Sequence, residues 1–149
     1  MSGIGYIPIR VEQNPTNEDL ATAESVLYEI HDLLKFLLAE GKGGAIDLRA
    51  WPNLNQASLG LLEKRLSVGE VSAVVTGIGR TEIRETAYTG VWWQVYRNEN
   101  GDIVTETILV TEVPEILKSQ KADIERGLKK LNGVLSAPIK QEFADQTAA

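Results

Sequence analysis

The first half of the chain is dominated by a stretch in which apolar residues recur every three or four positions. Thr16 and Asp19 have the spacing of a capping box in an acidic form, which predicts that a helix begins there. Its apolar positions are Leu20, Ala23, Leu27, Ile30, Leu34 and Leu37. This spacing puts them on one face of a long helix. Gly41 can adopt a left-handed cap conformation, so we expect the helix to end near Glu40.

A short strand and a second helix are expected next. Residues 45–48 are a strand candidate, followed by a turn at Trp51-Pro52-Asn53. Either Asn53 or Asn55 can cap the helix that comes after the turn. The apolar spacing predicts that its buried side consists of Ala57 or Ser58 with Leu59, Leu62 and Leu66.

The period then changes to two, which is typical of strands. Residues 71–76 carry apolar side chains on both faces and are predicted to form a central strand. Gly77-Ile78-Gly79 is a turn into a strand over residues 81–88. Residues 91–97 and 103–111 flank Asn100-Gly101, a dipeptide that strongly favours a β-hairpin.

The two ends of the chain predict peripheral elements. Residues 6–11 alternate apolar and other positions around Pro8, which favours an edge strand or an extended arm. Pro114 can begin a helix with an apolar stripe at Leu117, Ile124, Leu128 and Leu131, interrupted at Gln120 and Lys121. Residues 132–149 are expected to be a loosely attached tail.

Together these elements predict an α+β fold. We expect a single domain over residues 1–149, in which a largely antiparallel sheet of four to six strands packs against the long N-terminal helix and additional shorter helices. A chain of 149 residues with 43% hydrophobic residues is long enough to bury such a core.

Composition excludes several classes of function. The net charge of −6 argues against a general grip on nucleic acid or on anionic lipid. The absence of cysteine excludes disulfides, thiolate nucleophiles and thiolate-held metals, and a single histidine weakens other metal sites. No secretory signal and no apolar run of about 20 residues is found, so we expect a cytoplasmic protein without membrane insertion.

Candidate chemical motifs mostly fail on context. The Gly77 and Gly79 pair lacks the third glycine of a dinucleotide site and leads into a strand. Gly41-Lys42-Gly43-Gly44 follows a helix and lacks the order of a phosphate-binding loop. His31 has no partner at helical spacing and is interpreted as a partly buried helix residue.

The charged and aromatic residues of the sheet leave alternatives open. Glu70, Glu85 and Glu106 could converge across strands as an acid–base site, or could instead pair with Arg80, Arg84 or Arg97. Trp92 and Trp93 are adjacent on a strand and therefore point to opposite faces. Either one of the two is exposed as a binding anchor, or both are covered.

Five blocks of sequence carry a resemblance to a known family. In order along the chain they are GAIDLR (residues 44–49), GEVS (69–72), EIRET (82–86), GVW (90–92) and VPE (113–115). Over about residues 43–117 the chain resembles the C-terminal domain of hydrogenase expression and formation proteins of the HupH, HyaF and HoxQ type. The resemblance implies a cytoplasmic chaperone for the small subunit of an uptake nickel–iron hydrogenase, which carries iron–sulfur clusters and a twin-arginine export signal.

The expected activity is therefore binding without catalysis, metal or cofactor. The resemblance implies that the partners are the small-subunit precursor and other hydrogenase accessory proteins, and a homodimer is a further expectation. Glu70, Arg84 and Glu85, together with Trp92 or Trp93, are predicted to mark the partner surface. The alternatives are a small acid–base enzyme using a sheet glutamate and a structural subunit of a larger assembly.

Overall fold

The computed structural model describes residues 14–137. The chain divides into two compact units, Met1–Pro114 and Glu115–Ala149. The strand expected at residues 6–11 and the last twelve residues of the expected tail lie outside the described residues. The organisation of residues 1–149 as one domain stays a prediction.

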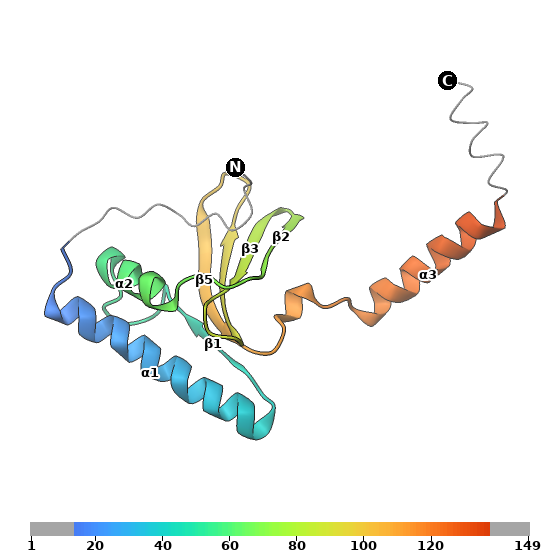
Figure 1. Cartoon of the computed structure of the whole chain (residues 1–149). Coiled ribbons are helices and arrows are strands. Elements are labelled where there is room, and N and C mark those ends of the chain that lie inside the picture. Colours follow the sequence, from blue (N-terminus) through green and yellow to red (C-terminus); the bar gives the residue numbers. More distant parts are fainter. Residues whose placement is uncertain (1–13, 138–149) are drawn as a thin grey trace. The chain divides into compact units, whose positions relative to one another are not determined.

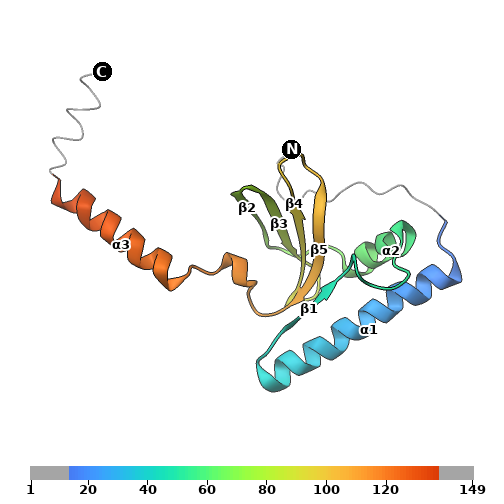
Figure 2. The same cartoon turned by 180° about the vertical axis from the view of Figure 1, so that it is seen from behind.

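The first unit is an α+β fold, as the hydrophobic pattern predicts (Figure 1). Its elements in chain order are α1 (Asn17–Glu40), β1 (Gly44–Asp47), α2 (Gln56–Leu66), β2 (Ser72–Gly77), β3 (Gly79–Glu85), β4 (Val91–Arg97) and β5 (Ile103–Val110). Both helices lie over the same face of the sheet (Figures 1 and 2).

The five strands form one antiparallel sheet in the order β1-β5-β4-β3-β2. Strands β2 to β5 are successive hairpin neighbours, and Figure 2 shows them in that sequence. The first strand, β1, instead crosses over to pair with the last one, so that Ile46 lies opposite Ile108. The expected hairpin at Asn100-Gly101 joins β4 to β5, with Gly101 at a φ of 84°.

The prediction that residues 71–76 form a central strand is wrong, because β2 is at the edge of the sheet. Its Ala73, Val74 and Val75 are only half-buried. An apolar run indicates side chains that tolerate burial, whereas the position of a strand depends on pairing between distant segments. The next strand also ends early, at Glu85, since the Thr86 hydroxyl accepts from the backbone N–H of Tyr88 at 3.2 Å and turns the chain.

Local capping explains where both helices begin. The Thr16 hydroxyl accepts from the Asp19 N–H at 3.1 Å, and the Asp19 carboxylate accepts from the Thr16 N–H at 2.9 Å, which is the predicted capping box. Gly41 ends α1 in the left-handed conformation, with a φ of 69°. Of the two candidate caps for α2, Asn55 takes the role.

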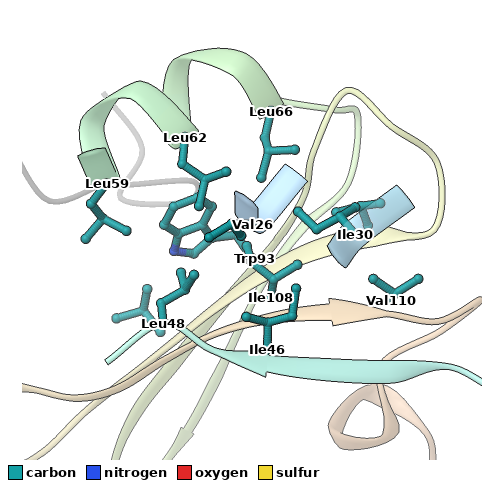
Figure 3. Close-up of a cluster of buried hydrophobic side chains, with 12 residues drawn as sticks. Val26, Ile30, Ile46, Leu48, Leu59, Leu62, Leu66, Trp93, Ile108 and Val110 are labelled. Carbon is teal, nitrogen blue, oxygen red and sulfur yellow. The ribbon is translucent and has the colours of Figure 1, made fainter. Parts of the chain in front are cut away.

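The core lies between the two helices and the sheet (Figure 3). Its buried members come from α1, α2 and three strands or their ends: Val26, Ile30, Ile46, Leu48, Leu59, Leu62, Leu66, Val91, Trp93, Val95, Ile108 and Val110. The predicted buried positions of α2 are thus confirmed, with Ser58 fully covered beside them. We call the side of the sheet that carries Trp93 the helix-covered face.

The second unit contains a short 3₁₀ turn (Glu115–Leu117) and the helix α3 (Lys121–Ser136). The sequence predicts one helix after Pro114, but Leu117 is separated from the rest of its stripe by non-helical residues 118–120. The interruption at Gln120 and Lys121 therefore marks a real break, with Gln120 at the N-cap. The helix continues past Asn132 and Gly133 to Ser136.

Candidate functional site

Glu70 occupies an exposed bend between α2 and β2. The bend is fixed by backbone bonds on both sides of it: the Gly69 N–H donates to the Glu85 carbonyl, and the Glu85 N–H donates to the Val71 carbonyl, each at 2.8 Å. A Cβ at position 69 would lie 2.3 Å from the Thr86 carbonyl oxygen. A side chain at position 69 would clash with this oxygen, so the position requires glycine. The next residue, Glu70, is exposed, whereas Glu85 is half-buried.

Arg84 lies inside the structure, with 6% of its surface exposed. Its guanidinium donates to the carbonyl of Ser67, at the end of α2, at 3.1 Å. The same group sits over the ring of Trp93, 5.0 Å from the ring centroid. Arg84 therefore ties the end of α2 to the sheet and covers Trp93, which is an architectural role.

Both tryptophans are buried, as the second of the two alternatives predicts. Trp93 is 2% exposed on the helix-covered face, and its indole N–H donates to a carboxylate oxygen of buried Glu106 at 2.9 Å. Trp92 is 6% exposed on the opposite face, and its indole N–H donates to the Thr111 carbonyl at 3.1 Å. Each polar ring edge has a partner inside the protein.

The predicted partner residues consequently do not form one surface. In the register of β3 and β4, Arg84 lies opposite Trp93 and Glu85 lies opposite Trp92, so the two pairs occupy different faces of the sheet. Glu70 is exposed and Glu85 is half-buried, while Arg84 and both tryptophans are covered. A surface anchor at Arg84, Trp92 or Trp93 is not what the structure shows, because their polar groups serve the fold.

The two strand residues of the predicted acid–base site, Glu85 and Glu106, do not converge. Glu106 lies opposite Val95 on the helix-covered face, whereas Glu85 shares the other face with Trp92. Cross-strand pairing is found at a different glutamate, Glu82, whose carboxylate accepts from Arg97 Nε on β4 at 2.7 Å. A nitrogen of Arg80, on the same strand as Glu82, lies 3.9 Å from the other oxygen of this carboxylate.

His31 is exposed and contacts the neighbouring Asp32 at 3.2 Å. It is not the partly buried helix residue expected from the sequence, because it lies on the solvent side of α1. A depression of about 320 Å³ beside it is lined, among the described residues, by Glu24, Leu27, Tyr28 and His31 of that one helix. Tyr28 is 71% exposed, so this depression is open to solvent and offers no enclosed site.

A second hollow, of about 370 Å³, lies where the start of α1 meets the loop before α2. Its lining includes Asp19, Trp51 and Asn55. The pKa of the Asp19 carboxyl is lowered from its ordinary value, first by the hydrogen bond from the Thr16 backbone and then by the one from the Asn55 side chain. The Asp19 carboxylate thus accepts hydrogen bonds at the N-termini of both α1 and α2.

Within the second unit, every residue of α3 is exposed. Apolar side chains recur along it at spacings of four, three and four residues: Ile124, Leu128, Leu131 and Leu135, exposed by 58, 59, 54 and 73%. We call these four residues the α3 stripe. The sequence pattern predicts three of these four positions as an apolar stripe. It does not show that they are exposed, and exposure is the property that makes an apolar stripe a candidate binding surface.

Between residues 14 and 137, no cluster of three or more histidine or acidic side chains is arranged to hold a metal ion. Over that range no helix has both the length and the apolar character required to cross a bilayer.

Comparison with known proteins identifies relatives across most of the chain. Residues 20–138 match the HupH hydrogenase expression protein, C-terminal conserved region. The match is wider than the blocks at residues 43–117, since it includes almost all of α1 and α3. The resemblance drawn from those blocks is confirmed.

Among curated proteins, the hydrogenase expression/formation protein HupH of Rhodobacter capsulatus is 27% identical over 123 residues, covering 83% of this chain and 44% of that protein. HoxQ of Azotobacter vinelandii, described in the same words, is 29% identical over 76 residues, or 51% of this chain and 27% of that protein. The chain thus spans less than half the length of these relatives.

A solved structure supports the fold as well. The hydrogenase expression protein HupH from Thiobacillus denitrificans superposes with a TM-score of 0.75 at 37% sequence identity. The superposition covers 78% of this chain and 96% of that one.

Proposed function

Because the chain belongs to the HupH hydrogenase expression protein family, through its C-terminal conserved region, we propose that it is an accessory protein in hydrogenase maturation. Its relatives are named for the expression and formation of hydrogenase, which supports this role.

The proposed client is the small-subunit precursor of a nickel–iron hydrogenase, bound in the cytoplasm before its export and assembly. This is a role of capture rather than turnover. A chain with no cysteine and one histidine is poorly equipped to deliver nickel or to pass on an iron–sulfur cluster, whereas binding a protein needs no such ligands.

The observation that carries the proposal is the α3 stripe. Four apolar side chains, each more than half exposed, lie along one side of a 16-residue helix. Amphipathic helices bind protein grooves through anchors at this spacing, and contiguous exposed apolar surface commonly marks a protein-binding site. We therefore place the client contact on the α3 stripe, with Glu70 as an additional exposed candidate.

Capture of the precursor by purified protein tests the proposal. The variant Leu128→Gln/Leu131→Gln removes the centre of the stripe and keeps residues with good helix propensity. We expect its dissociation constant for the precursor to rise at least about tenfold, since burying one leucine is worth about 1.5–3 kcal/mol. Isothermal titration with precursor carrying its export signal measures the effect.

The matched control is Lys129→Gln/Lys130→Gln, which changes two exposed positions of the same helix outside the stripe. It should bind the precursor within about twofold of the unchanged chain if apolar contact dominates. Absence of precursor binding by the unchanged chain would reject the client, whereas equal weakening by both variants would reject the stripe as the contact.

A further inference from the structure

The outer edge of β2 lacks the usual protection against pairing with another strand. Within residues 14–137, β2 has β3 as its only strand neighbour. Its residues Ser72–Gly77 include neither a charged side chain nor a proline. The other edge strand, β1, has only four residues and ends in Asp47. Short length and charge are the devices by which natural sheets protect their edges, and β2 has neither.

The register shows which backbone groups face outward from β2. The Glu85 N–H donates to the Val71 carbonyl, so residue 71 directs its backbone groups toward β3. Hydrogen bonding alternates along an antiparallel strand, and Ala73 and Val75 therefore also bond to β3. The N–H and C=O groups of Ser72, Val74 and Thr76 point away from the sheet.

From this edge we infer that β2 pairs with β2 of a second copy of the chain, antiparallel, around a two-fold axis at Val74. In that register Val74 faces itself, Ser72 faces Thr76, and Ala73 faces Val75. From Ser72 to Thr76 each residue thus meets one of its own kind, hydroxyl against hydroxyl and aliphatic against aliphatic. The surface is self-complementary, as a two-fold interface requires, and the three outward residues of each copy supply about six backbone hydrogen bonds.

Charges at the ends of the edge fit the same register. Glu70 is exposed, and the Arg80 side chain is 44% exposed. Arg80 of β3 lies opposite Thr76 of β2. Since Thr76 faces Ser72 of the other copy in the proposed register, Arg80 is level with that Ser72. Glu70 comes two residues before Ser72, so Glu70 of that copy lies toward the same end of the paired strands as Arg80. The charges at each end of the paired strands are therefore of opposite sign, and no like charges face each other along β2.

Single-cysteine variants of the full chain test the register directly, because the chain contains no cysteine of its own. Val74→Cys should form a disulfide-linked dimer under mild oxidation, since paired residues across such strands have Cα atoms about 5.5 Å apart. Ser72→Cys alone and Thr76→Cys alone should cross-link at least about tenfold more slowly, because each lies about 13 Å along the strand from its own copy. Mixing the two should restore the cross-link.

Sedimentation of the full chain tests the pairing without a covalent bond. We expect twice the 16.3 kDa chain mass at high concentration, with dissociation on dilution. Ser72→Lys/Thr76→Lys sets lysines opposite each other and should raise the dissociation constant at least about tenfold. The control Thr105→Lys adds a charge at an exposed position of β5 and should leave it unchanged.

Hydrogen exchange distinguishes a second copy from any other occupant of the edge. In the dimer the amides of Ser72, Val74 and Thr76 should be protected in proportion to chain concentration, while those of Ala73 and Val75 stay protected at all concentrations. A chain that stays monomeric, a dimer unaffected by the lysines, protection independent of concentration, or protection that requires a client protein would each overturn the inference.

Discussion

The side chains of Asp19 and Asn55 join the N-termini of the two helices. Asn55, which caps α2, donates from its amide nitrogen to one carboxylate oxygen of Asp19 at 2.8 Å. The other oxygen of that carboxylate accepts from the Thr16 N–H and completes the cap of α1. One ionised group thus satisfies backbone at one helix and positions the cap of another.

This arrangement predicts how stability depends on pH. The fold lowers the pKa of Asp19, so its stabilising effect is complete above the ordinary aspartate pKa of about 3.9 and is lost as the pH falls through the lower folded value. Asp19→Asn should lower the melting temperature at pH 7, and the difference from the unchanged chain should shrink toward pH 3. Thermal unfolding by circular dichroism measures both. Asp102→Asn, at an exposed turn, is the control; a difference for Asp19→Asn that does not vary with pH would contradict the account.

The two tryptophans should differ in what their indole N–H groups contribute. Trp93→Phe removes a hydrogen bond to the buried carboxylate of Glu106, a loss of about 1.5–3 kcal/mol for a charged acceptor. Trp92→Phe removes a bond to a neutral backbone carbonyl, for which about 1 kcal/mol is expected. Urea unfolding should therefore rank Trp93→Phe as the more destabilising. The opposite order would mean that the carboxylate bond is not the main contribution of Trp93.

Two glycines should respond to alanine with opposite signs. Gly69→Ala places a Cβ 2.3 Å from the Thr86 carbonyl, so the chain must shift, at a cost of about 1–3 kcal/mol. Gly60→Ala, inside α2, meets no atom within 4 Å and should stabilise the protein by about 0.5–1 kcal/mol through helix propensity. Chemical denaturation of both variants provides the comparison, and destabilisation of equal size at both positions would contradict it.

We expect replacement of Arg84 to lower the stability of the fold rather than to remove a direct contact with the client. Arg84→Ala removes the hydrogen bond to the Ser67 carbonyl and the contact with the Trp93 ring, with an expected loss of about 2–3 kcal/mol in the free energy of unfolding. If the variant kept its melting temperature but bound the client more weakly, Arg84 would be a residue of the partner surface, as predicted from the sequence.

Replacement of Glu70 tests whether this exposed residue belongs to the client-binding surface. Glu70→Lys reverses the charge of an exposed side chain and should leave the free energy of unfolding within about 0.5 kcal/mol. Weaker precursor binding by this variant in a titration would support Glu70 as a contact. Unchanged binding would remove it from the predicted set.

Features set by near neighbours in the sequence were predictable. Thr16, Asp19 and Gly41 act through bonds within one turn of the helix, so the ends of α1 follow from spacing alone. The hairpin at Asn100-Gly101 is equally local. Turn chemistry of this kind needs no knowledge of the rest of the fold.

Features set by distant segments were not predictable in the same way. The edge position of β2 follows from β1 pairing with β5, a contact that no local pattern encodes. Alternation along a strand correctly separates Trp92 from Trp93, but it does not say what covers either face. Arg84 was assigned to the surface because of its charge, whereas the Ser67 carbonyl and the Trp93 ring give that charge partners inside.

The pairing of the first strand with the last one also determines when the protein can fold during its synthesis. Ile46 emerges from the ribosome early, yet its partner Ile108 follows some sixty residues later, and the core between sheet and helices needs both. Until Val110 has been made, the apolar side of α1 has no completed sheet to cover it. We therefore expect the nascent chain to expose apolar surface until β5 has been made, and a fragment that stops short of β5 to be degraded rather than to accumulate.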